Sequence, residues 1–266
     1  MTFFAPLSPL WLSLAFLASA GVLLLARMAA GYLQRRPLSG IQNALLFGMG
    51  VPLVGIAISS FVANSNGGGW LALIFACLAL LPLLLSVITD LRGHEIYYAV
   101  LYMGAAIVAL GDMTVFYHLR DFGYDPVLTG IAGELIEGRF RAIGGILLLG
   151  GIFAGLRLLG WLLLRNTRLV EEAPTEDDPI DAVMGSGDTA LAIFIGAALG
   201  PLMGLVAVVL GIMVFGSHAL IIFIRERLMR RPLGAASVPN APGLMIGFVV
   251  AWAFPAVIGA WLTGGI

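Results

Sequence analysis

The chain has 266 residues, of which 60% are hydrophobic and only 11% are charged. A soluble domain carries roughly a quarter charged residues, so this composition excludes an ordinary soluble protein and favours one that crosses a membrane several times. The formal net charge of −1 gives no electrostatic indication of a nucleic-acid partner. Every basic residue is an arginine, and the absence of lysine from the sequence excludes Schiff-base chemistry and a P-loop.

The apolar runs predict an all-α fold: a polytopic membrane bundle of about eight transmembrane helices in a single domain, residues 1–266. The longest run, 188–224, contains the helix-breaking pair Gly200–Pro201, and we divide it into two closely connected helices. The first run is too long for a typical signal peptide, and we expect it to be retained. The predicted spans are 9–33, 44–63, 69–89, 95–112, 142–164, 188–204, 205–224 and 242–263.

Arginine placement predicts the orientation, because cytoplasmic loops of membrane proteins are enriched in positive charge. Most arginines fall in cytoplasmic segments when both chain ends lie outside the cytoplasm. The acidic, proline-containing segment 165–187 then forms a solvated cytoplasmic loop. With this orientation Asp90 lies at the cytoplasmic end of the third span and Asp188 at the cytoplasmic start of the sixth. The two acids are therefore expected on one side of the membrane.

An aspartate at the edge of a membrane span indicates a functional site, because hydrocarbon penalises charge heavily. Two carboxyl groups that share a proton can activate water for aspartyl proteolysis. Asp188 follows Gly185, Ser186 and Gly187, and the two glycines permit close approach by an extended peptide. Taken alone, the same segments are also consistent with polar turns in which the aspartates cap helices.

The single cysteine, Cys77, lies within an apolar run and is expected to be a packed thiol. One cysteine cannot form a disulfide within the chain or a four-cysteine zinc site. The three histidines, at positions 94, 118 and 218, show no metal-ligand spacing. We therefore expect neither a metal nor a cofactor.

Three segments resemble the signatures of the type IV prepilin peptidases, which are membrane aspartyl proteases of the GxGD type. They are DLRGHEI at 90–96, GSGDTAL at 185–191 and SVPNAPGLMIG at 237–247. The resemblance implies that Asp90 and Asp188 are the catalytic residues. The residues implied to contact the substrate are Gly185, Ser186, Gly187, Pro239 and Pro242.

The resemblance implies an aspartic endopeptidase of the inner membrane. Its substrate would be a type IV prepilin or pseudopilin-like precursor, whose leader peptide is cleaved at the cytoplasmic face. The chain departs from the family pattern, because Ala190 stands where a lysine is usual and Tyr97 where a proline is usual. It also lacks the paired CxxC motifs of the zinc-binding domain that many bacterial members carry. These departures put the family's second activity, N-methylation with S-adenosylmethionine, in question.

Two other classes of membrane protein remain alternatives. A transporter would place ionisable groups near mid-membrane at broken helices, and the Gly200–Pro201 break is compatible with this, although we expect no acid beside it. A non-catalytic scaffold would tolerate the loss of either aspartate. Glu95 and His94 are expected to be solvated turn residues. Asp112 and His118 are expected on the opposite side of the membrane from Asp90 and Asp188.

Overall fold

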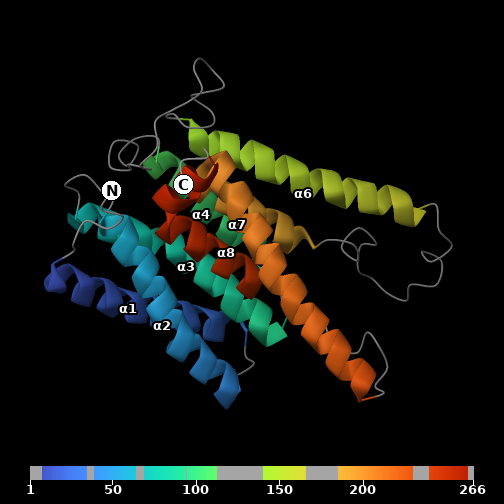
Figure 1. Ribbon diagram of the computed structural model, residues 1–266, viewed down its shortest axis with the longest axis horizontal. Coiled ribbons are helices and arrows are strands. Elements are labelled where there is room, and N and C mark those ends of the chain that lie inside the picture. The colour runs from blue at the N-terminus through green and yellow to red at the C-terminus, as the bar shows by residue number, and fades with distance from the viewer. Residues whose placement is uncertain are drawn as a thin grey trace.

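The computed structural model describes residues 8–34, 39–63, 69–93, 95–112, 140–165, 185–229 and 240–262, and these residues form helices with no strand among them (Figure 1). The predicted all-helical class is confirmed. The helices are α1 (Pro9–Leu33), α2 (Gly40–Ala63), α3 (Gly69–Gly93), α4 (Tyr98–Gly111), α6 (Arg141–Arg165), α7 (Ser186–Leu228), α8 (Ala241–Ala253) and α9 (Pro255–Leu262).

Five of the described helices, α1, α2, α3, α6 and α7, are long and apolar enough to cross a membrane. Two others, α4 and α8, are apolar but contain only 14 and 13 residues. At 1.5 Å per residue each is about 20 Å long, which is shorter than a typical hydrocarbon core of about 30 Å. The count of eight transmembrane spans therefore stays a prediction.

The long apolar run in α7 reverses direction at Gly200, as the glycine–proline pair predicts. Gly200 has φ 77° and ψ −178°, a conformation that interrupts the helix and that glycine adopts without a steric penalty. Gly196 and Gly204 are eight positions apart, and in a continuous helix they would be separated by about 12 Å. A Cβ added at Gly204 would instead lie only 3.5 Å from the Cα of Gly196. The segments 186–199 and 201–228 therefore fold back on each other. The break lies at Gly200, before the predicted boundary between the two spans.

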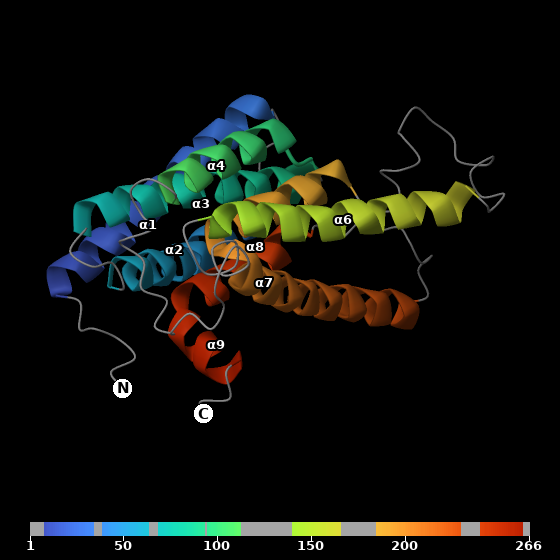
Figure 2. The same cartoon turned by 90° about the horizontal axis from the view of Figure 1, so that it is seen from above.

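The C-terminal span, predicted as one helix over 242–263, is instead broken at Phe254. This residue has φ −124° and ψ 45° and separates α8 from α9, which begins at Pro255. Proline cannot donate a backbone hydrogen bond and disfavours helical geometry in the residue before it, which accounts for the break. Figure 2 shows α9 extending away from the rest of the bundle.

Glycines allow α7 to pack very closely against the helices on either side of it. A Cβ added at Gly145 of α6 would overlap the carbonyl oxygen of Gly196, and one added at Gly247 of α8 would overlap that of Ala207. Both Gly196 and Ala207 belong to α7. Small residues at such crossings let helix backbones approach, which is the main source of helix association where water is absent.

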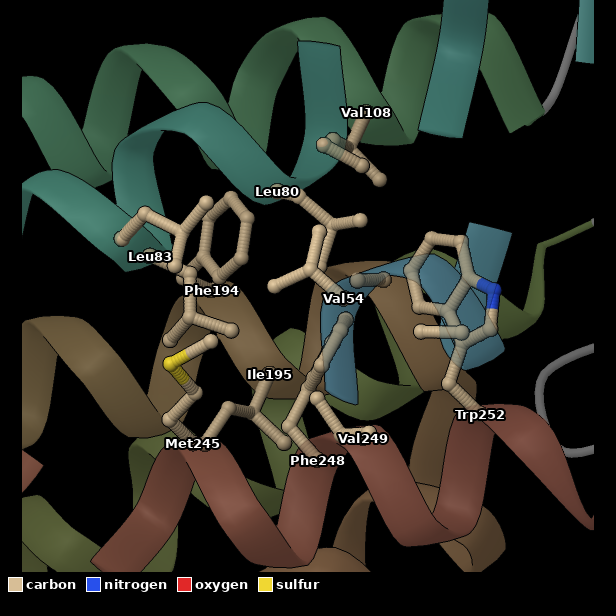
Figure 3. Packing of buried hydrophobic residues seen from close by; sticks show 14 of the residues in the cluster. Val54, Leu80, Leu83, Val108, Phe194, Ile195, Met245, Phe248, Val249 and Trp252 are labelled. Carbon is tan, nitrogen blue, oxygen red and sulfur yellow. The ribbon is translucent and has the colours of Figure 1, made fainter. Parts of the chain in front are cut away.

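A core of buried apolar side chains surrounds α3, the most enclosed of the five long helices. Leu80 and Leu83 of α3 meet Phe194 of α7 and Phe248 of α8 (Figure 3). The rings of Phe248 and Trp252 on α8 lie 4.9 Å apart between centroids. Through these side chains α3 packs against both α7 and α8.

The substitution Gly145→Ala tests the close crossing of α6 and α7. We expect it to lower the free energy of unfolding by at least about 1–3 kcal/mol, since the new methyl group must displace backbone rather than a flexible side chain. Thermal unfolding of the detergent-solubilised protein measures this change.

Gly151→Ala is the matched control on the same helix, because a Cβ there meets nothing within 4 Å. It should be neutral or stabilise the protein by up to about 1 kcal/mol through helix propensity. Equal unfolding temperatures for the two variants would contradict the proposed crossing.

Candidate active site

The start of α8 joins the two aspartates that the sequence identifies. The backbone N–H of Ala241 donates to Asp90 Oδ2 at 2.9 Å, and the side-chain Nδ2 of Asn240 donates to Asp188 Oδ1 at 3.1 Å. The negative charge of Asp90 also acts on the carboxyl group of Asp188. Two residues that are 98 positions apart in the sequence are therefore neighbours at one site.

Asp90 lies in the last turn of α3, which continues to Gly93 and past the predicted end of the third span. Its side chain is only 5% exposed. The C-terminal end of a helix disfavours a negative charge, but the N-terminal end of α8 compensates by directing an otherwise unpaired N–H at the carboxylate. Pro242 in the first turn of α8 lacks an N–H and so adds no unpaired donor there.

Asp188 lies in the first turn of α7, where a helix favours an acidic side chain. The helix is capped by Gly185, whose carbonyl oxygen accepts from the N–H groups of Asp188 and Thr189. Asp188 is therefore not the N-cap, and α4 is likewise preceded by Tyr97 without a side-chain cap. The interpretation of the two aspartates as caps of their own segments is wrong.

Gly187 is buried against Ile96, which lies between α3 and α4. A Cβ added at Gly187 would lie 2.5 Å from the Cβ of Ile96. The glycine thus lets the GSGD segment pack directly on the end of the DLRGHEI segment. Gly187 therefore serves the packing of the two segments, whereas the sequence suggested only that it would let an extended peptide approach.

Three of the other residues predicted to contact a substrate are buried to a similar, intermediate degree. Gly185, Ser186 and Pro242 are partly buried beside the aspartates, so they are neither fully enclosed nor fully open to solvent. Pro239 and His94 lie outside the described residues. That Gly185, Ser186, Pro239 and Pro242 contact a substrate stays a prediction.

Two further polar groups lie at the site, and the sequence alone does not identify them. Thr189 Oγ1 and Asn240 Oδ1 are buried and have no hydrogen-bond partner among the described residues. Such atoms cost about 1–3 kcal/mol each when unsatisfied, so they are typical of positions where water or a ligand binds. In the sequence, the local indication of Asn240 was its place as a polar residue between the two prolines of the segment 237–247.

Glu95 lies next to the site but has a different set of partners. Its Oε2 accepts from Gln34 Nε2 at 2.8 Å and from the Tyr97 hydroxyl at 3.3 Å. Loss of hydration raises the pKa of the Tyr97 phenol, and the charge and hydrogen bond of Glu95 raise it further. The exposed Glu95 therefore fits its expected place in a turn, although it is also bound to α1 through Gln34.

An ionisable pair lies beside the break in α7, which corrects the expectation that no acid is near it. Arg141 at the start of α6 makes a two-pronged ion pair with Asp112 at the end of α4: Nε donates to Oδ2 at 2.8 Å and Nη2 to Oδ1. Both side chains are buried. The stem of Arg141 lies next to Gly200, since a Cβ added there would be 3.5 Å from the arginine Cβ.

No protein-family model, curated protein or solved structure matches the chain. Among the described residues there is no group of three histidine, cysteine, aspartate or glutamate side chains that could hold a metal ion. The described residues place two neighbouring carboxyl groups, an amide side chain and a helix N-terminus at the site.

Replacing Asp90 tests the contact with α8. In Asp90→Ala the buried N–H of Ala241 loses its acceptor, and we expect the free energy of unfolding to fall by about 1–3 kcal/mol. Asp90→Asn keeps a carbonyl oxygen at the same position and should unfold close to wild type. Chemical unfolding monitored by tryptophan fluorescence measures both variants, and similar losses in the two would rule out this hydrogen bond as the stabilising contact.

Proposed function

We propose that the chain is a membrane aspartyl endopeptidase in which Asp90 and Asp188 activate one water molecule. The observation that supports this most is the pair of hydrogen bonds from adjacent residues, Asn240 and Ala241, to the two carboxyl groups. A single short segment thereby holds one oxygen of each acid. This fixes the orientation of both carboxyl groups, as a shared catalytic site requires.

In the proposed mechanism the two carboxyl groups share one proton. The ionised aspartate takes a proton from the water molecule, and the water oxygen attacks the scissile carbonyl carbon. The protonated aspartate meanwhile donates a hydrogen bond to the carbonyl oxygen. The tetrahedral intermediate then loses its C–N bond, and a proton passes from an aspartate to the departing amine. The products are a carboxylic acid and an amine, and the pair again holds one proton.

The proposed substrate is a type IV prepilin or pseudopilin-like precursor. Support comes from the resemblance of the segments at 90–96, 185–191 and 237–247 to the prepilin peptidase signatures, together with the packing of Gly187 on Ile96, which joins the first two segments. In this proposal the protein is a multi-pass protein of the inner membrane with both chain ends outside. The acids then act at the cytoplasmic face, where the basic leader of such a precursor would lie. N-methylation is not part of the proposal.

A transporter is the second candidate, and the observation that favours it is the buried Asp112–Arg141 pair beside the broken helix at Gly200. Transporters place ionisable groups at such breaks. The pair is already joined by two charge-assisted hydrogen bonds. A structural role in fixing the reversal of α7 is therefore the simpler account of it.

Removing either acid tests the endopeptidase. A pilin-like precursor co-expressed with Asp90→Asn or Asp188→Asn should be processed at least about 100-fold more slowly than with wild type, because one partner in acid–base catalysis is lost. The readout is the size of the precursor on a gel over time, at equal amounts of membrane-inserted enzyme.

Glu95→Gln is the matched control, since it makes the same chemical change in an acid outside the proposed pair. It should process the precursor at nearly the wild-type rate. Normal processing by Asp90→Asn or by Asp188→Asn would refute the shared-acid mechanism, and processing lost in all three variants would contradict the assignment to this pair.

A further inference from the structure

Two arginines lie near each other on the side of α3 that faces away from the aspartates. Arg92 follows Asp90 by two positions, and residues two apart in a helix lie about 200° apart around its axis. Arg92 therefore points toward α1, where Arg27 is its charged neighbour and the positive charges of the two side chains repel. These two cations lie outside the contacts that form the candidate active site.

The guanidinium group of Arg92 is incompletely satisfied. Its Nε and Nη1 are buried and have no hydrogen-bond partner among the described residues. Arg92 as a whole is half-buried, but charged donor atoms shut off from water without an acceptor are costly, and a second cation beside them adds to the cost. An anion between the two side chains would relieve both penalties.

The nearby acidic side chains have other partners. Glu95 accepts hydrogen bonds from Gln34 and Tyr97, and Asp90 accepts one from the start of α8. No ion pair joins Arg27 or Arg92 to an acid in the part of the chain that the structure describes. Among the described residues, no acid therefore neutralises this pair of arginines.

Small and apolar residues of α1 and α2 surround the two arginines. Gly31 lies one turn after Arg27 on α1, and a Cβ added there would be 3.8 Å from Arg92 Nη1. The exposed Arg27 lies over the ring of Phe47 on α2, with its guanidinium carbon 5.6 Å from the ring centroid. Leu24 and Met28, which flank Arg27 on α1, are 49% and 64% exposed and would lie against lipid chains.

We propose that Arg27 and Arg92 form a binding site for a phosphate group, carried by an anionic phospholipid or present as free phosphate. A guanidinium group presents paired N–H donors that match phosphate oxygens, and two such groups neutralise its charge. The site does not depend on the proposed peptidase activity.

The test uses the full-length protein, delipidated in dodecyl maltoside. Thermal unfolding is measured after adding phosphatidylglycerol or, as its control, diacylglycerol with the same acyl chains. It is also measured after adding inorganic phosphate, with chloride at the same ionic strength as the control. We expect phosphatidylglycerol, inorganic phosphate or both to raise the melting temperature of the wild type by at least about 4 °C at saturation, with no such rise from diacylglycerol or chloride.

Arg27→Gln is the test variant because Arg27 is exposed and its loss should not impair folding. It should unfold like wild type without ligand and bind the phosphate-bearing ligand at least about tenfold more weakly, owing to the lost charged hydrogen bonds. Arg225→Gln removes an exposed arginine at the far end of α7 and should bind like wild type.

The two ligands distinguish the sources of the phosphate group. Stabilisation by phosphatidylglycerol alone assigns the site to a lipid headgroup, and stabilisation by inorganic phosphate as well assigns it to phosphate itself. The proposal is overturned if neither ligand stabilises the wild type, if diacylglycerol does so equally, or if Arg27→Gln and wild type bind with the same affinity.

Discussion

A carboxylate removed from water must receive hydrogen bonds from the protein, and Asp90 receives one from the first N–H group of α8. That bond also determines where Asn240 lies, because Asn240 immediately precedes the donor. Its side chain then reaches Asp188 on a different helix. The geometry of the candidate site thus depends on how α8 begins, and every contact that positions α8 also positions the two acids relative to each other.

The glycine contacts of α7 provide that positioning. Gly247 brings α8 against the second segment of α7, and Gly145 brings α6 against the first. The reversal at Gly200 allows one continuous stretch of sequence to supply both surfaces. At the other end of the first segment, the contact between Gly187 and Ile96 fixes the start of α7 beside the end of α3. Small residues therefore act here as packing elements that bring three helix ends together.

The sequence predicted the features that depend on the residues of a single segment of the chain. Apolar runs identified the helices, and aspartates at the edges of two runs identified the residues that the structure brings together. The break at Phe254 was missed although Pro255 signals it, because the flanking residues are continuously apolar. Asn240, the Gly187–Ile96 contact and the placement of Asp112 with Arg141 beside Gly200 depend on packing between distant segments, and no local pattern encodes them.

In the proposed site Asp90 and Asp188 behave as one coupled pair, and infrared titration of their carboxyl stretching bands measures that coupling. Difference spectra of wild type, Asp90→Asn and Asp188→Asn across pH would separate the two groups. We expect two separated titration steps in wild type, and a shift of at least about one pH unit in the remaining aspartate when the other is replaced. If each aspartate titrates at the same pH whether or not its neighbour is replaced, the two carboxyl groups are not a coupled pair.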